Sequence, residues 1–262
     1  MSEDDVWTGR KAHSARVYDY IIGGKDNYEV DQAAAEDSLK VWPGLRDSML
    51  LNRATMRRMG HWLATEAGLR QFLDIGTGIP TEPNLHQVVQ HVAPDSRIVY
   101  VDNDPVVLAH AAALMTSTAE GRTSYISADM HRPEALLDHP DLHATIDLGR
   151  PVGLTIIAML QFVEDARGLI ESLTGHLVSG SYLALTVPTH ELAPESAALA
   201  RTYTDLGIPM YLRGRAEIEG WLGGFEVLDP GVVPMSRWRP EPGDPVLPDD
   251  ATNMYAVVAR KP

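Results

Sequence analysis

Short apolar runs alternate with stretches of helical periodicity along most of the chain. Runs rich in β-branched and other apolar residues predict strands, because such side chains fit the surface of a sheet. These strands are expected at residues 71–75, 97–101, 124–127, 153–158, 182–187, 225–228 and 254–259. Apolar residues three and four positions apart predict helices at 47–66, after Gly78, after Pro105, at 193–206 and at 215–222. The order of strand and helix indicates an α/β fold with parallel strands joined by right-handed crossovers.

The pattern divides the chain into two parts. Residues 1–69 are helical and polar, contain a loop-like stretch at 21–28, and end near Gly68, a typical helix stop. Residues 70–262 carry the alternating strands and helices, with a linker rich in proline and glycine from Pro230 to Pro248. Because the chain has 262 residues and no internal repeat, we expect the two parts to form one compact unit.

Composition places the chain among ordinary globular proteins, with 44% hydrophobic and 22% charged residues. No window approaches the roughly 18 consecutive apolar residues that a membrane span requires. Residues 1–5 are acidic, unlike the basic start of a secretory signal, so a cytoplasmic location is expected. The chain has no cysteine, which excludes disulfides and thiolate metal sites.

The formal net charge of −14 argues against general binding of DNA or RNA, because an acidic surface repels a polyanion. A small molecule or a protein is therefore favoured as partner over nucleic acid. The densest basic cluster consists of Arg53, Arg57 and Arg58. Their helical context favours a solvated helix face over a binding patch.

The main chemical signal is the segment Asp74-Ile75-Gly76-Thr77-Gly78, which follows the first expected strand and precedes a helix. Glycines at such a turn let a ligand approach the backbone closely, because no Cβ intervenes. A bare Gly-x-Gly motif is weak by itself. Its place between a strand and a helix, with an acid after the next strand, makes it a candidate nucleotide-binding turn.

Acidic residues end three successive strands: Asp74, Asp102 and Asp129. A carboxylate at Asp102 can accept both ribose hydroxyls of an adenosine, and Asp129 could meet the adenine amine. Asn103 and Met130, next to these two acids, join Thr77 and the glycines in the expected cofactor contacts. Asp129 could instead cap the turn before Pro133.

Two details favour S-adenosylmethionine over NAD as the adenosine ligand. A dinucleotide fingerprint would require glycine at position 81, where the chain has Thr81, and Pro80 has no N–H for a pyrophosphate. Asp74 would repel phosphates but suits an ammonium or sulfonium group. Asp104 before Pro105 is best explained as a helix N-cap, which weakens the idea of a metal-binding Asp-x-Asp. The histidines lack zinc-ligand spacing, and no metal site is expected.

Beyond these motifs, the chain resembles an actinobacterial family of S-adenosylmethionine-dependent methyltransferase-like proteins, of mostly unassigned substrate, in the class I methyltransferase superfamily. The resemblance covers almost the whole chain. It rests on these segments: 15–20 with 23–28, 52–53, 71–81, Asn84 with His86, 99–105, 237–240 and 255–259. Together they are far more specific than one glycine motif.

The resemblance implies a Rossmann-like, seven-stranded and mostly parallel sheet whose last strand is antiparallel, with S-adenosyl-L-methionine across the carboxyl ends of the first strands. It also implies that the N-terminal helical segment is a lid over the site. Tyr28, beside a Gly-Gly pair, would contribute to a partly apolar cover and contact the cofactor. The neighbouring tyrosines could equally pack the N-terminal helices onto the sheet. In the linker, Trp238 and Arg239 could face the methyl acceptor or anchor the loop.

One position departs from the family pattern. After the fourth strand the family often has a histidine, whereas this chain has Gln161, which cannot take a proton at neutral pH. Glu164, Asp165 and His190, near the ends of the fourth and fifth strands, are weak candidates for a general base. A helix N-terminus would favour acidic residues at Glu164 and Asp165 even without a catalytic role.

The function expected from the sequence is methyl transfer from S-adenosylmethionine to an unidentified acceptor. A non-catalytic S-adenosylmethionine-binding or regulatory protein is the alternative, and Gln161 keeps it open. An NAD-dependent oxidoreductase is less favoured, because the third glycine of the dinucleotide fingerprint is missing.

Overall fold

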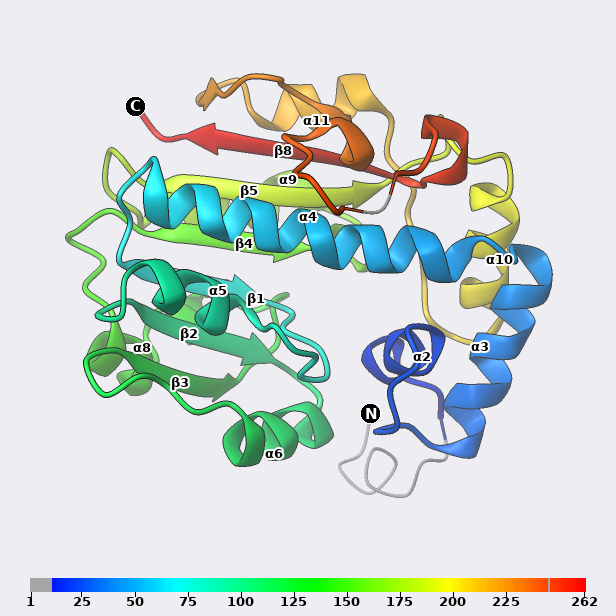
Figure 1. The fold of residues 1–262 in the computed structure, drawn as a ribbon, viewed down its shortest axis with the longest axis horizontal. Helices are drawn as coiled ribbons and strands as arrows, with labels where there is room; N and C mark the ends of the chain where they lie inside the picture. Colours follow the sequence, from blue (N-terminus) through cyan, green and yellow to red (C-terminus); the bar gives the residue numbers. More distant parts are fainter. Residues whose placement is uncertain (1–10, 245) are drawn as a thin grey trace.

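A mixed sheet of eight strands forms the centre of the structure, a computed structural model that describes residues 11–244 and 246–262 (Figure 1). The strand order is β3-β2-β1-β4-β5-β8-β6, and β7 also pairs with β8. Strands β1 to β5 are parallel, and β8 runs antiparallel to its neighbours. The strands are β1 (Gln71–Ile75), β2 (Arg97–Asp102), β3 (Arg122–Ser127), β4 (Gly153–Ile157), β5 (Tyr182–Pro188), β6 (Glu226–Val227), β7 (Val233–Pro234) and β8 (Met254–Arg260).

The expected α/β class and the antiparallel last strand are confirmed, and all seven expected strands are present within a few residues of their predicted ends. The added strand, β7, is only two residues long and lies in the proline- and glycine-rich linker. The acidic residues 1–5, which argued against a secretory signal, lie outside the described residues. No helix in the described parts of the chain could serve as a membrane span, since each is too short or too polar.

Helices connect the strands and cover both faces of the sheet (Figure 1). Asp104 accepts a hydrogen bond from the Val106 amide and begins its helix with Pro105 in the first turn, which confirms the predicted N-cap. The helices are α2 (Ser14–Ile21), α3 (Glu29–Val41), α4 (Leu45–Thr65), α5 (Leu85–Val92), α6 (Pro105–Leu114), α7 (Pro133–Leu137), α8 (Pro140–Thr145), α9 (Ala166–Gly175), α10 (Ser196–Asp205) and α11 (Arg215–Trp221), with short 3-10 turns η1 (Leu160–Phe162), η2 (Met235–Arg237) and η3 (Asp249–Ala251).

The longer strands contribute alternate residues to two separate cores. Phe72 packs under α4 and α5 on one face, whereas Leu73 packs with α7, α8, α9 and α11 on the other. This alternation follows from the two-residue period of a strand. Helix α4 crosses β4, β5 and β8 in front of the sheet in Figure 1, so part of the N-terminal segment shares a core with the alternating part.

The N-terminal helices α2 and α3 lie beyond the strand ends and pack against α10 (Figure 1). Val17, Ile21 and Ala35 of these helices form a third core with Leu199 and Tyr203 of α10. These helices therefore cover the edge of the sheet where the parallel strands end. Their opening and closing as a lid stays a prediction.

The basic cluster on α4 does not form the expected solvated face. Arg58 is buried, donates to the carbonyl oxygens of Met235 and Trp238, and forms an ion pair with Asp244. A buried guanidinium is tolerated here because its N–H groups find carbonyl and carboxylate partners. Trp238 is itself fully buried, so the linker is anchored against α4.

Candidate functional site

The turn after β1 has the backbone shape that its glycines permit. Gly76 and Gly78 have φ angles of +74° and +68°, a left-handed region that favours glycine. A Cβ atom on Gly76 would lie 2.3 Å from the Met159 side chain, so no larger residue fits there without rearrangement. The amide groups of Gly76 and Thr77 both donate to the Val101 carbonyl, which fixes the turn against β2.

Asp102 at the end of β2 is joined to this turn. Its Oδ2 accepts from the Gly78 amide at 2.9 Å, and its Oδ1 accepts from the Asp104 amide at 2.9 Å. Burial raises the pKa of Asp102, and these two backbone hydrogen bonds oppose the shift. Each carboxylate oxygen keeps a free lone pair, so Asp102 can still accept hydrogen bonds from a ligand.

Asp74 lies at the end of β1 and accepts a hydrogen bond from the Thr155 hydroxyl. Burial raises its pKa to about 6, while the hydrogen bond from Thr155 and the nearby Arg53 guanidinium act in the opposite direction. Arg53 is placed by hydrogen bonds to the carbonyl oxygens of Thr81 and Pro83. A buried carboxylate that ionises near neutral pH is suited to hold a cationic group.

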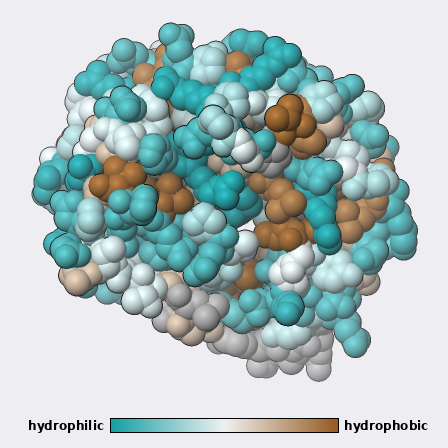
Figure 2. Space-filling model, viewed as in Figure 1, coloured by the Kyte–Doolittle hydropathy of each residue, from teal (hydrophilic) through white to brown (hydrophobic). Residues whose placement is uncertain are grey.

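A cavity of about 330 Å3 lies between the strand ends and the helices that cover them. Figure 2 shows the face of Figure 1 as largely hydrophilic and hollowed near its centre, where apolar residues border the hollow. Most of the expected cofactor residues line the cavity: Asp74, Gly76, Thr77, Gly78, Asp102, Asn103 and Met130. The structure thus brings together predicted residues from the ends of β1, β2 and β3.

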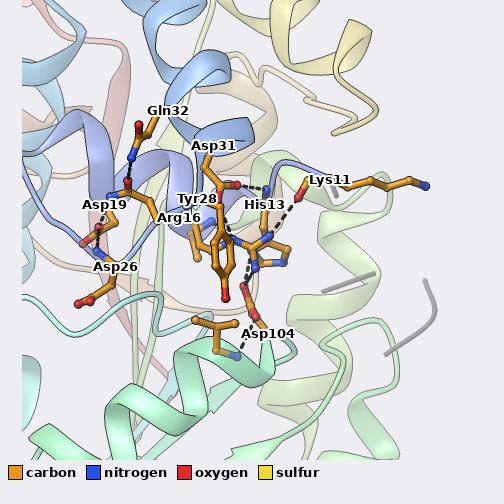
Figure 3. Close-up of polar contacts among 12 residues, drawn as sticks. Lys11, His13, Arg16, Asp19, Asp26, Tyr28, Asp31, Gln32 and Asp104 are labelled. Atoms are coloured by element: carbon orange, nitrogen blue, oxygen red, sulfur yellow. Dashed lines mark hydrogen bonds and ion pairs between the residues drawn. The ribbon is translucent and has the colours of Figure 1, made fainter. Parts of the chain in front are cut away.

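Two expected cofactor residues do not line this cavity. The Asp129 carboxylate is 44% exposed and is bonded to the amide and ring nitrogen of His131 at 3.0 and 2.8 Å. That contact fits the alternative in which Asp129 caps a turn. The Tyr28 ring is 36% exposed and lies beside the Arg16 guanidinium, 5.2 Å from its centre (Figure 3).

Gln161, on η1 directly after β4, does line the cavity. Its Nε2 donates to the Ala158 carbonyl at 2.6 Å, and its Oε1 has no hydrogen-bond partner among the described residues. Ala158 has a φ of 53°, which is unusual for a residue with a side chain, and its amide donates to the Thr186 hydroxyl. Such a conformation costs about 1–3 kcal/mol and often occurs where function requires a particular geometry.

The three weak candidates for a general base lie outside the cavity lining. Asp165 accepts from the Gly168 amide and caps α9, as the helix-terminus explanation predicted. Glu164 and His190 are exposed on the surface. Within residues 11–244 and 246–262, no cluster of three or more acidic or histidine side chains could hold a metal ion.

The other half of the cavity is formed by residues that the sequence analysis did not select. They come from α2, α4, α10 and the segment after α10: Tyr18, Met49, Asn52, Leu199, Tyr203, Ile208 and Met210. Tyr18 and Asn52 lie in segments that carry the family resemblance, 15–20 and 52–53, whereas the other five belong to no recognisable motif. Arg53, which follows Asn52 and also lines the cavity, was assigned with the arginine cluster to a solvated face.

A buried ion-pair network ties this covering layer to the end of β2 (Figure 3). Arg16 of α2 bonds to Asp31 of α3 at 2.9 Å and to Asp104 at 2.8 Å. All three side chains are almost fully buried. The His13 ring lies 3.2 Å from Asp104, and its backbone amide donates to Asp31. The network ties α2 and α3 to Asp104, two residues after Asp102 at the end of β2.

The sheet order, the glycine turn after β1 and the acid after β2 define a Rossmann-like class I methyltransferase that uses S-adenosylmethionine. A family model described as S-adenosyl methyltransferase matches residues 3–262, and the chain belongs to this family. The resemblance inferred from the sequence motifs is thereby confirmed. No match to the chain was found among curated proteins.

Solved structures agree with this assignment. A DUF574 family protein from Streptomyces avermitilis is 50% identical, covers 97% of this chain and 99% of its own, and has a TM-score of 0.94. A proposed methyltransferase from Thermobifida fusca is 40% identical, with coverages of 96% and 95% and a TM-score of 0.88. The plantazolicin methyltransferase BpumL, 10% identical with a TM-score of 0.52 over 99% and 98% of the two chains, shares the fold alone.

Proposed function

We propose that this methyltransferase acts on a small molecule that enters the covered cavity beside the cofactor. The observation that carries the proposal is the cavity itself, about 330 Å3, with the glycine turn on one side and apolar side chains of the covering helices on the other. This volume lies at the lower end of the range for small-molecule sites. Methyl transfer is an in-line displacement, so a covered cavity can contribute by aligning the reactants and limiting the access of water.

In this proposal the cofactor lies across the ends of β1, β2 and β3. Asp102 accepts hydrogen bonds from the ribose hydroxyls, and the turn from Gly76 to Gly78 lets the ligand pass close to the backbone. Asp74 balances the positive charge of the amino-acid end. Asn103 and Met130 contact the adenosine. Tyr28 and Asp129 do not line the cavity, and the proposal assigns them no contact.

A nucleic-acid acceptor is disfavoured for two reasons. The net charge of −14 repels a polyanion, and the helices α2 and α3 cover the strand ends where a base would have to enter. A protein acceptor would have to present a side chain through the same cover. The second candidate function is cofactor binding without catalysis. It is favoured by Gln161, because the family that the sequence motifs resemble often has a histidine at this position and glutamine cannot act as a base.

The proposal is tested by calorimetry followed by a transfer assay. Purified protein is titrated with S-adenosylmethionine, S-adenosylhomocysteine and NAD, and is then incubated with methyl-labelled cofactor and separated small-molecule, protein and nucleic-acid fractions of a bacterial extract. We expect both adenosyl ligands to bind, NAD not to bind, and label to enter the small-molecule fraction. Label in macromolecules alone would overturn the acceptor class, and binding without any transfer would favour the non-catalytic alternative.

A further inference from the structure

The half of the cavity away from the glycine turn has an apolar wall. Six of the side chains that form it are Met49, Phe162, Leu199, Tyr203, Ile208 and Met210. None of them carries a charge, and such a surface favours an apolar ligand body, because transfer of apolar area out of water is favourable. We call this part of the cavity the acceptor half.

The polar atoms without partners at the acceptor half are both hydrogen-bond acceptors. Asn52 and Gln161 line the cavity, are buried, and each has an amide oxygen with no partner among the described residues. Their amide nitrogens are engaged: Gln161 donates to the Ala158 carbonyl, and Asn52 donates to the Tyr18 hydroxyl at 3.3 Å. The Tyr18 hydroxyl donates its own proton to a carbonyl, which fixes the direction of the Asn52 bond. A ligand that fits here brings an N–H or O–H donor.

The titratable side chains described at the acceptor half include Tyr18, Asp19 and Tyr203. Burial raises the pKa of Tyr18 and of Tyr203, so both hydroxyls stay protonated. Burial also raises the pKa of Asp19, while hydrogen bonds from Asn27 and from the Asp26 amide to its Oδ2 oppose the shift. A neutral amine can enter this half without a charge, whereas a phenolate or a carboxylate would bring an anion beside two amide oxygens.

The remaining titratable groups of the cavity lie toward the cofactor. Asp74, Tyr100 and Asp102 are on β1 and β2, and His131 follows β3, where it is paired with Asp129. His13 is paired with Asp104 at the start of α6. The Arg53 guanidinium is bonded to carbonyl oxygens of the loop after the glycine turn. Of these groups, Arg53 also borders the acceptor half, because its charge opposes the rise in the pKa of Tyr18.

We propose that the methyl acceptor is a small, mainly apolar amine, and that the Gln161 Oε1 accepts a hydrogen bond from its N–H. This inference rests on the proposed function of the same cavity. Gln161 lines the same cavity as Gly76 and lies two residues after Met159, whose side chain packs against Gly76.

The reaction uses the neutral amine, so an ammonium ion must first lose its proton to solvent before it enters the cavity. The nitrogen lone pair of the neutral amine forms the new C–N bond, and the C–S bond breaks with its electron pair going to sulfur. The positive charge therefore moves from the sulfonium to the ammonium product, which keeps its N–H and loses a proton to solvent after release. The amide oxygens of Gln161 and Asn52 stabilise the charge that develops on nitrogen, because they are partial negative charges already in place.

Three probes of equal size separate the amine from other acceptors. 2-Phenylethylamine, 4-ethylphenol and phenylacetate are each supplied at millimolar concentration with methyl-labelled cofactor, and products are identified by mass spectrometry. We expect methylation of the amine alone. Methylation of the phenol or the carboxylate in preference to the amine, or of none of the three by protein that binds S-adenosylmethionine, overturns the inference. If the purified protein does not bind S-adenosylmethionine, the result contradicts the proposed function and not the choice of acceptor.

Variants of Gln161 test its role. Gln161→Leu removes the amide oxygen and is expected to lower kcat/KM for the amine about tenfold, the equivalent of one hydrogen bond, with unchanged cofactor affinity in calorimetry. Gln161→Glu restores an acceptor and adds a base, so it should keep amine turnover and gain activity on 4-ethylphenol. Wild-type amine turnover by the leucine variant, or no phenol activity in a glutamate variant that binds the cofactor, contradicts the assignment.

Discussion

Replacement of Asp102 by alanine tests the central feature of the cofactor site. The Asp102 carboxylate is almost fully buried, and its two oxygens accept from the amides of Gly78 and Asp104. In the proposed complex the same carboxylate also accepts from two ribose hydroxyls. The variant therefore loses ligand contacts and, at the same time, two hydrogen bonds that shape the site.

The expected loss follows from the number of hydrogen bonds. A hydrogen bond to a charged group contributes about 1.5–3 kcal/mol. Two ribose contacts at the lower end amount to about 3 kcal/mol, equivalent to a Kd about a hundred times weaker. The loosened turn at Gly78 adds to this loss, so a hundredfold effect is a lower bound.

Calorimetric titration with S-adenosylmethionine measures the effect, and thermal unfolding of the same samples reports whether the fold is intact. Asp129→Ala is the matched control, because Asp129 also follows a strand and is bonded to His131, but its own side chain does not line the cavity. We expect this control to bind within about twofold of wild type. Near-wild-type affinity in a folded Asp102→Ala protein would refute the assignment of the ribose contact.

Three further outcomes follow from the site and its cover. Burial raises the pKa of Asp74 to about 6, so the ionised carboxylate is lost as the pH falls through that value. The affinity for S-adenosylmethionine, measured by calorimetry, should therefore decrease below about pH 6 in the wild-type protein. The Asp74→Asn variant should not show this pH dependence. Arg16→Met removes the guanidinium from two buried carboxylates and should cost about 3–5 kcal/mol in urea unfolding, against less than about 1 kcal/mol for the exposed pair broken by Arg215→Met. Gly76→Ala should abolish cofactor binding, because the new Cβ would lie 2.3 Å from a methionine side chain. Gly68 also has a positive φ, but a Cβ there would meet nothing within 4 Å, so Gly68→Ala should only lower the melting temperature.

The fold was largely predictable from the sequence because buried parallel strands leave a strong signal. Runs such as 71–75 and 182–187 are apolar and bounded by turn residues, and their ends were found within a few residues. Strand β7 was missed, since two residues, Val233 and Pro234, give no periodicity and a proline argues against a strand. The buried position of Arg58 was also missed, because its partners lie in the linker far along the chain.

The cofactor half of the site was more predictable than the acceptor half for a physical reason. Asp74, Gly76 and Asp102 follow strand ends, and the topology of a parallel sheet places such positions together. Met49 and Leu199 lie in the interiors of helices, where a cavity-lining residue and a core residue have the same apolar character. Only tertiary packing decides between the two, so sequence spacing could not identify them.

Helix α4 has a consequence for the order in which the protein can assemble. The Ser48 hydroxyl donates to the Asn253 side chain at 3.0 Å, across 205 positions, and the Arg58 side chain donates to the Trp238 carbonyl across 180. During synthesis α4 therefore leaves the ribosome long before its partners exist, and it must wait with its apolar side uncovered. Contacts of such long range slow folding and prolong exposure to aggregation. The packing of α4 can be completed only after β8 has been made, so this early helix is among the last elements to reach its final place.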